Sequence, residues 1–222
     1  DRSADVAVGG VDGLTTGRVS TALARADQAL AQAELQAPQG VRVHELADGE
    51  AIGETEWRQR IAGALDAGRL RLAEHPVVDA GGAVLHLECP LRVQLQPEGP
   101  FDAAARWLPM AARSRLVHRI DLAALELALQ AITRDGRARC VHVAAASLAD
   151  AGFVREVALR LQRDAGAAAQ LSIEVGESVA QHWPQWRAAA AQWRPLGARL
   201  GIENAGGALH MLLDARKLGL DY

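Results

Sequence analysis

The feature that most constrains the fold is the alternation of short apolar segments with amphipathic helical segments over most of the chain. Segments typical of buried strands begin near Arg139, Gln170 and Arg199, and stretches with helical periodicity lie between and after them. Strands that alternate with helices in this way form a mostly parallel sheet, and several such units favour a barrel. The sequence therefore predicts an α/β fold, and the last predicted strand is only starting at Tyr222.

A hairpin is predicted before the first of these units. The segments LRLAEHPVVD and AVLHLECPLR flank the glycine pair 81–82, which is typical of a tight turn between antiparallel strands. Before the hairpin, residues 54–68 carry large apolar side chains at helical spacing and finish with a glycine, as many helices do. We therefore predict a helix, an antiparallel first strand and then the parallel units.

Two aspartates mark predicted helix starts. Asp121 precedes the amphipathic stretch 122–132, and Asp150 precedes a second such stretch. Aspartate is a preferred N-cap residue because its carboxylate accepts hydrogen bonds from the first amides of a helix, so we expect both residues to be caps. Trp186 and Trp193 fall at helical spacing in a later helix, where we expect them to lie in the core or an interface.

The N-terminal segment has a strand-helix-strand pattern of its own. Residues 5–10 and 41–46 resemble strands. The helical stripe between them consists of Val19, Leu23, Ala26, Leu30 and Ala33. The acidic, glycine-containing stretch that follows is typical of a linker. The sequence predicts three parts: a small α/β remnant at residues 1–46, a linker at 47–53 and a larger domain at 54–222.

Charge and cysteine content exclude several classes of protein. The net charge is −3, whereas a protein that binds the nucleic-acid backbone needs a surplus of cations, so no DNA or RNA partner is expected. Cys89 and Cys140 are too few for a disulfide framework, and we interpret both as inert packing. The sequence has no apolar segment long enough to span a bilayer and no signal-peptide pattern, so we expect a cytoplasmic chain.

Polar side chains stand at or near the carboxyl ends of four predicted strands. They are Glu88, His142, Glu174 and the Glu203-Asn204 pair. Because the carboxyl ends of parallel barrel strands meet on one face, we expect these side chains to converge. The carboxylate at position 88 stands among leucines, where burial without a partner or a function would be costly.

From about residue 54 onward, the motifs together resemble the EAL domain, which binds cyclic di-GMP and in active members hydrolyses it. The stretch HLECPLR is similar to the signature Glu-Ala-Leu-Leu-Arg, with Glu88 at the acid and Arg92 at the arginine. HPVVD, RWLPMAARSRLVHRID, IEVGES and IENAGGALHMLL are similar to further motifs in the family's order. The resemblance implies an incomplete TIM-like (β/α) barrel with an antiparallel first strand. Upstream, LARADQALAQAE resembles the last helix of a GGDEF domain, so residues 1–46 are expected to be its C-terminal remnant.

The resemblance implies a nucleotide site at the barrel mouth. Its expected residues are His75, Glu88, Leu91, Arg92, Glu174, Glu203 and Asn204. Arg92 is expected to contact a phosphate through its planar guanidinium group, and His75 to reach a guanine edge. The alternatives are an ion pair between Arg92 and Glu88 at the rim, and a solvated strand residue at His75.

The resemblance also implies a metal site, here in vestigial form. Its ligands would be Glu88, His142, Glu174 and Glu203. His142 replaces a ligating asparagine of the family, and imidazole suits zinc or manganese better than magnesium. We therefore expect no required cofactor, with Mg²⁺ or Mn²⁺ needed only for residual phosphodiesterase activity. A hydrogen-bonded core histidine is the preferred alternative for His142, and a role in helix capping is an equal alternative for Glu174.

The sequence predicts a catalytically inactive cyclic di-GMP receptor or regulatory domain in bacterial signalling, similar to receptors of the LapD type. The partners implied are cyclic di-GMP, an upstream GGDEF domain, and a second copy or another signalling protein; the parent protein would be anchored at the inner membrane. One alternative is a weak metal-dependent phosphodiesterase that relies on Glu88, Glu174 and Glu203. Another is an interaction module that no longer binds nucleotide. We also expect an open barrel, or one completed by exchange with a second copy.

Overall fold

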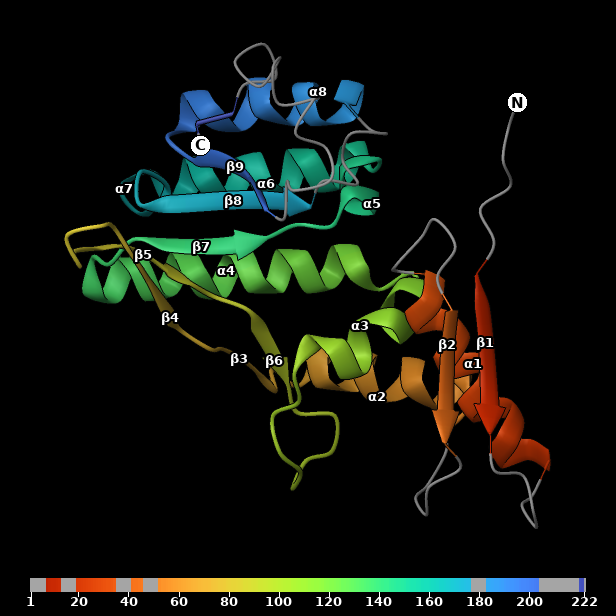
Figure 1. Ribbon diagram of the computed structural model, residues 1–222. Helices are drawn as coiled ribbons and strands as arrows, with labels where there is room; N and C mark the ends of the chain where they lie inside the picture. The colour runs from red at the N-terminus through yellow and green to blue at the C-terminus, as the bar shows by residue number, and fades with distance from the viewer. Residues whose placement is uncertain are drawn as a thin grey trace. The chain divides into compact units, whose positions relative to one another are not determined.

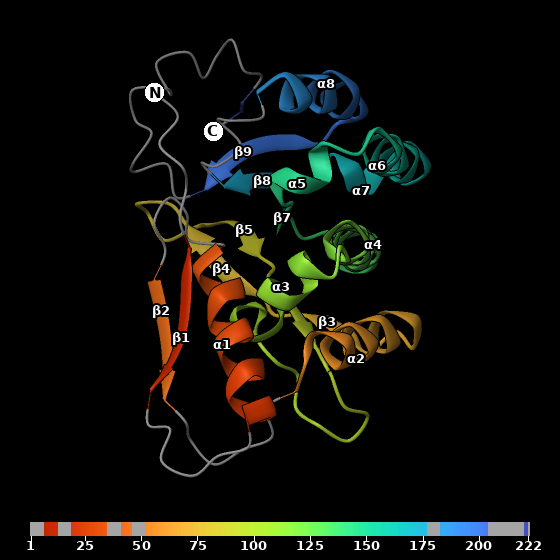
Figure 2. The ribbon, with the colours of Figure 1, turned by 90° about the vertical axis from the view of Figure 1, so that its right-hand side faces the viewer.

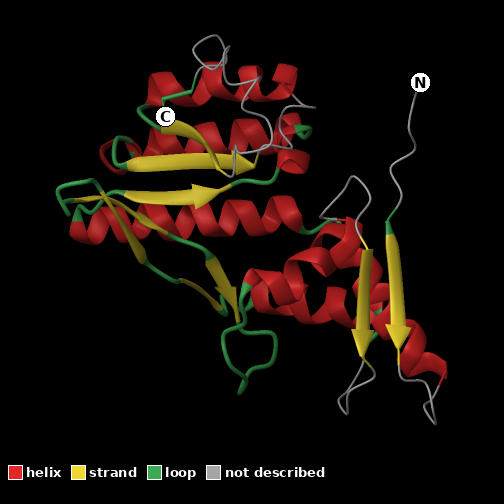
Figure 3. Ribbon diagram, viewed as in Figure 1, coloured by secondary structure: helices red, strands yellow, loops and turns green. Residues whose placement is uncertain are grey.

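The structure is a computed structural model that describes residues 7–12, 19–34, 41–45, 52–176, 183–203 and 220–221. Its helices and strands are shown in Figure 1, and by type in Figure 3. The chain divides into two compact units. The first comprises Asp1–Arg69 with Val93–Leu116, and the second comprises Leu70–Arg92 with Val117–Tyr222. These units reflect packing, so the domain boundaries expected from the sequence stay a prediction.

The first unit begins with a small parallel sheet. Strand β1 (Val8–Asp12) pairs with β2 (Val41–Glu45), and helix α1 (Val19–Glu34) packs against both strands, as Figure 1 shows. A side chain at Gly9 would clash with the backbone of Leu30, so α1 approaches β1 as closely as glycine allows.

The helical stripe expected to be buried in α1 is corrected by the structure at its amino-terminal end. Val19 and Leu23 are 70% and 65% exposed, and the buried side chains of this helix are Ala22, Ala29, Ala31 and Ala33. Towards the carboxyl end of α1 the predicted stripe is better buried, because Ala33 is fully buried and Ala26 and Leu30 are half-buried.

Helices α2 (Glu54–Asp66) and α3 (Ala104–Arg113) complete the first unit. Trp57 and Ile61 of α2 are buried as their spacing predicts, and Trp107 of α3 is buried as well. Arg113 ends α3 and connects it to α1, because its guanidinium group forms ion pairs with Asp27 and Glu34.

The second unit contains the main sheet, whose strand order is β4-β5-β7-β8-β9. Strands β4 (His75–Val78) and β5 (Val84–Glu88) form the predicted antiparallel hairpin. Strands β5, β7 (Arg139–His142), β8 (Leu171–Gly176) and β9 (Arg199–Glu203) run parallel to one another. A separate pair joins β3 (Leu70–Leu72) to β6 (Leu91–Val93). The mixed α/β fold with an antiparallel first strand is therefore confirmed.

The hairpin turn shows why its sequence folds this way. The carboxylate of Asp79 accepts hydrogen bonds from the backbone amides of Gly81 and Ala83, at 2.8 and 2.9 Å. Gly82 has a φ of +84°, a backbone conformation that glycine adopts without steric cost. The turn fixes the register in which β4 lies beside β5.

Long helices cover one face of the main sheet. Figure 2 shows α4 (Val117–Asp135), α6 (Ala151–Arg163) and α8 (Trp183–Trp193) on the same side of the strands. The short helices α5 (Ala145–Leu148) and α7 (Ala165–Ala168) and the 3-10 turn η2 (Arg194–Leu196) connect these elements. Trp186 and Trp193 are fully buried in this layer, as predicted. No helix among the described residues is both long enough and apolar enough to cross a bilayer.

A buried arginine joins three segments at the amino end of β7. Arg139 is 1% exposed, and its guanidinium group lies 2.5 Å from a Glu74 carboxylate oxygen and 2.7 Å from one of Asp135. The hydrogen bonds and charge of Arg139 hold the pKa of the Asp135 carboxyl well below its usual range. The buried guanidinium is thus neutralised by two carboxylates, one from the end of α4 and one from the residue before β4.

The two predicted helix caps have different outcomes. Asp150 is the N-cap of α6 and accepts hydrogen bonds from the amides of Gly152 and Phe153, which confirms the prediction. Asp121 is not a cap, because α4 begins four residues earlier, at Val117. Its buried carboxylate instead accepts hydrogen bonds from the Ala144 amide and the Ser147 hydroxyl, at 3.0 and 2.7 Å.

The buried Asp121 predicts a specific pH dependence of stability. Burial raises its pKa to about 6, and the two hydrogen bonds only partly oppose this change. Between about pH 4 and 6 the native state then binds more protons at this site than the unfolded state, whose pKa is about 3.9. Stability should therefore fall as the pH rises through this range, by roughly 2–3 kcal/mol, and change little above it.

Asp121→Asn is the matched variant for this prediction, since it keeps an acceptor oxygen but does not titrate. Urea unfolding at several pH values should show the wild type losing stability relative to the variant between pH 4 and 6. A constant difference across this range would show that Asp121 does not titrate as its burial implies.

Candidate functional site

Strand register places polar side chains on one face of the main sheet. Glu88 of β5 lies opposite Cys140 of β7, and His142 of β7 lies opposite Glu174 of β8. Successive side chains of a strand point to opposite faces. Val141, between Cys140 and His142, packs into the hydrophobic core beneath the helices. The polar side chains therefore point to the face of the sheet that the helices do not cover.

His142 lies among three carboxylates from three other strands. Its Nε2 atom is 3.5 Å from Oε2 of Glu174 and 3.4 Å from Oε2 of Glu203, and it forms an ion pair with Oε1 of Glu88. Glu203 is at the end of β9, opposite Gly176 of β8. The carboxyl-terminal parts of β5, β7, β8 and β9 thus bring one imidazole and three acids together. We call these four residues the His142 cluster.

The electrostatics of the His142 cluster favour a protonated imidazole. Burial acts to lower the pKa of His142, but hydrogen bonds to Glu174 and Glu88 and the charges of Glu203 and Glu88 outweigh it. The result is a pKa of about 10, compared with about 6.5 for an isolated histidine. At neutral pH the side chain is therefore a cation held between acids.

The other residues expected at the site lie on the first strands. His75 is exposed and lies opposite Glu88 in the hairpin register. On β6, Leu91 is 7% exposed and Arg92 is half-buried. Among the described residues no ion pair joins Arg92 to Glu88, since the recorded partners of Glu88 are His86 and His142. Asn204 lies outside the described residues.

The alternative that the sequence favoured for His142, a hydrogen-bonded core histidine, was wrong about its burial. Its side chain is hydrogen-bonded, but it is 35% exposed and its partners are the acids of the cluster, so it is not a core histidine. Sequence reasoning also missed His86 and Cys140, which lie beside Glu88. His86 stands two positions before Glu88, and Cys140 stands two positions before His142. Because alternate residues of a strand share a face, this spacing could have placed both side chains at the site.

The strand order and the convergent acids define the class of this domain. It is an α/β domain of barrel type, with a candidate site at the carboxyl ends of its parallel strands. The family model of the EAL domain matches residues 58–222, and the chain therefore belongs to the EAL domain family. Comparison with curated proteins gave no match.

Solved structures support the same fold. The S helix-GGDEF-EAL structure of Vibrio cholerae LapD bound to c-di-GMP is similar over 96% of this chain, with a TM-score of 0.82 and 19% identity. The chain spans 53% of that structure, about half its length. The FimX EAL domain from Pseudomonas aeruginosa bound to c-di-GMP is similar over 75% of this chain and 69% of its own, at 20% identity and a TM-score of 0.66. The c-di-GMP complex of the PaMucR phosphodiesterase is similar over 68% of this chain and 64% of its own, at 23% identity and a TM-score of 0.59.

Proposed function

We propose that this domain binds cyclic di-GMP without hydrolysing it and acts as a receptor or regulatory domain in bacterial signalling. Membership of the EAL domain family supports the nucleotide as ligand, as do similar structures that contain it. The location of the acids at the carboxyl ends of parallel strands supports the place of binding.

The position of His142 is the observation that best supports the proposed lack of hydrolysis. Active members of the family cleave the phosphodiester with water activated by divalent cations, and such cations need a dense set of oxygen ligands. Here one imidazole nitrogen lies within 3.5 Å of two carboxylates and in ion-pair contact with a third. The imidazole occupies the space between the acids where a magnesium ion would bind. Its positive charge already balances the negative charge of the acids. The residues present therefore do not fit the magnesium site of an active phosphodiesterase.

Nucleotide binding has less strict requirements than catalysis. Arg92 is half-buried on β6 and offers a planar donor group suited to a phosphate, while the exposed His75 lies across from Glu88. The cationic His142 reduces the repulsion that three nearby carboxylates would exert on an anionic ligand. We propose these residues, with Leu91, Glu88, Glu174, Glu203 and Asn204, as the binding site.

Two further parts of the proposal concern partners. The similarity to LapD covers 96% of this chain, which includes the segment before the EAL match, and this supports an upstream GGDEF domain. A second copy or another signalling protein would receive the signal. Anchoring of the parent protein at the inner membrane stays a prediction.

The second candidate function is a weak metal-dependent phosphodiesterase. It is favoured by the closeness of Glu88, Glu174 and Glu203, because all three acids lie close to one atom, Nε2 of His142. The similarity to the PaMucR phosphodiesterase adds support at the level of fold. Hydrolysis would require His142 to leave the position between these acids.

Calorimetric titration with cyclic di-GMP in the presence of a metal chelator tests the binding part of the proposal. We expect saturable binding by the wild type and an affinity at least about tenfold lower for Arg92→Ala, since a charge-assisted phosphate contact contributes roughly 1.5–3 kcal/mol. Arg155→Ala, an exposed arginine on α6, is the matched control and should bind like the wild type. Absence of heat with the wild type would leave only an interaction module, and equal binding by Arg92→Ala would place the site elsewhere.

A further inference from the structure

We propose that His86, Glu88, Cys140 and Glu174 form a binding site for a thiolate-binding divalent cation of the Zn²⁺ class. Each residue offers one ligand atom, and the four atoms lie within 4.8 Å of one another. We call these residues the Cys140 group. The site goes beyond the proposed function, because it needs no nucleotide and no catalysis.

The ligand types select the class of cation. A thiolate, an imidazole and two carboxylates are a four-ligand set for tetrahedral zinc, whereas magnesium avoids thiolate and prefers oxygen alone. Zinc at its usual bond lengths separates such ligand atoms by about 3.3–3.8 Å. The observed limit of 4.8 Å therefore requires only small side-chain adjustments.

The strands hold the Cys140 group in place. His86 and Glu88 stand two positions apart on β5 and so share a face, and Cys140 is the register partner of Glu88 on β7. Glu174 comes from the next strand, β8. Cys140 is fully buried and Glu174 is 8% exposed, so the ligands converge in a largely dry place on rigid elements.

Glu88 and Glu174 belong to both this group and the His142 cluster. The Oε1 atom of Glu88 forms the ion pair with His142, while its Oε2 atom lies 3.7 Å from Nε2 of His86. One carboxylate oxygen can therefore bind the cation while the other keeps its partner. His142 would then orient the ligand from the outer shell, as hydrogen-bonding partners of metal ligands commonly do.

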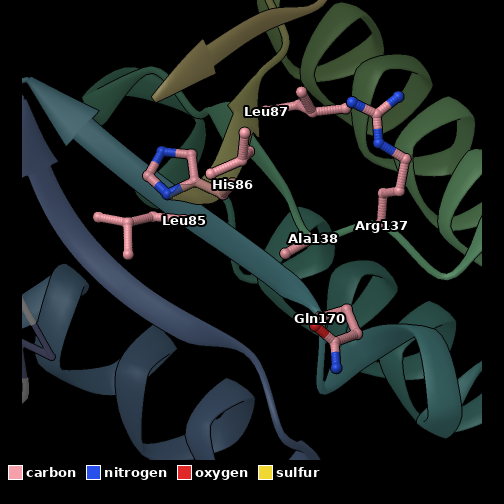
Figure 4. Close-up of a pocket in the computed structure, with 7 residues that line it drawn as sticks. Leu85, His86, Leu87, Arg137, Ala138 and Gln170 are labelled. Atoms are coloured by element: carbon pink, nitrogen blue, oxygen red, sulfur yellow. The ribbon is translucent and has the colours of Figure 1, made fainter. Parts of the chain in front are cut away.

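A pocket at the amino-terminal side of the strands shares His86 with the Cys140 group. It is lined by Val84, Leu85, His86, Leu87, Arg137, Ala138 and Gln170, six of which are labelled in Figure 4. Ala138 directly precedes β7, and Gln170 directly precedes β8.

Cobalt substitution tests the site through its sulfur ligand. The full chain, stripped with a chelator and kept reduced, should bind one equivalent of Co²⁺ and develop the near-ultraviolet absorption of a thiolate-cobalt bond, which one equivalent of Zn²⁺ removes. Cys140→Ser should abolish the absorption and weaken zinc binding at least about tenfold, since even the loss of an outer-shell partner costs about 10–100-fold in metal affinity. Cys89→Ser is the matched control, because Cys89 is equally buried but packs in the hydrophobic core.

His86→Ala provides a second variant if Cys140→Ser fails to fold, and it should also weaken zinc binding at least tenfold. The proposal is overturned if the wild type gives no thiolate-cobalt absorption, or if Cys89→Ser loses it as fully as Cys140→Ser. It is also overturned if Glu203→Gln removes the bound cobalt while Cys140→Ser keeps it, since the metal would then lie in the His142 cluster. All these measurements omit nucleotide, so their failure leaves the cyclic di-GMP proposal untouched.

Discussion

Replacing His142 with asparagine is expected to make the protein bind Mg²⁺ at least about tenfold more tightly than the wild type does, and to lower its stability without the cation. The imidazolium now balances Glu88, Glu174 and Glu203. Removing one partner of a buried ion pair costs roughly 3–5 kcal/mol, and we expect about 2 because this side chain is 35% exposed. A divalent cation can then take the place of the imidazolium between the acids.

Urea unfolding with and without Mg²⁺ measures both effects. A ligand that binds only the native state raises the free energy of unfolding, so Mg²⁺ should restore the stability of His142→Asn and leave the wild type nearly unchanged. His118→Asn on α4, a half-buried histidine outside the cluster, is the matched control and should show no response to Mg²⁺. Equal Mg²⁺ stabilisation of the wild type and His142→Asn would show that the imidazole does not occupy a cation position.

The largest effect on stability is expected for Trp193→Ala, about 4 kcal/mol. Trp193 is fully buried, its indole N–H donates to the backbone oxygen of Val154 at 3.0 Å, and its ring meets Phe153 edge-on at 6.4 Å. Truncation of a fully buried tryptophan loses apolar burial and leaves a cavity that the surrounding layer fills only in part, at a cost of roughly 3–5 kcal/mol.

Denaturant unfolding of Trp193→Ala compared with Trp183→Ala checks this prediction. Trp183 begins the same helix and is only partly buried against the core, so its replacement should cost less than half as much. If both variants lose the same stability, α8 is not anchored through the indole of Trp193 and the packing of this layer is different.

Much of the fold could be predicted because local signals and tertiary structure agree. The glycine pair after Asp79 forms the hairpin turn, and Asp150 caps its helix through hydrogen bonds that lie within three residues. The parallel strands were predictable from their alternation with helices, and the carboxyl ends of such strands meet on one face in any barrel. The sequence alone therefore predicted that Glu88 and Glu174 would lie near each other.

The sequence-based predictions failed where a contact with another part of the chain determines how a residue is placed. Asp121 precedes an apolar stretch, like a cap, but its partners are on another element, at Ala144 and Ser147. Leu23 fits the helical stripe of α1, yet it is 65% exposed, and the buried side chains of this helix are alanines. The pairing of His142 and the closeness of Cys140 depend on strand register, which periodicity does not specify.

The central claim is that this site binds cyclic di-GMP and does not cleave it. The most direct measurement is chromatography of cyclic di-GMP after long incubation with the wild-type protein and excess Mg²⁺ or Mn²⁺. We predict that the nucleotide is recovered intact, at protein concentrations where calorimetry shows it bound. Accumulation of linear pGpG in proportion to the protein would contradict the claim and establish a phosphodiesterase.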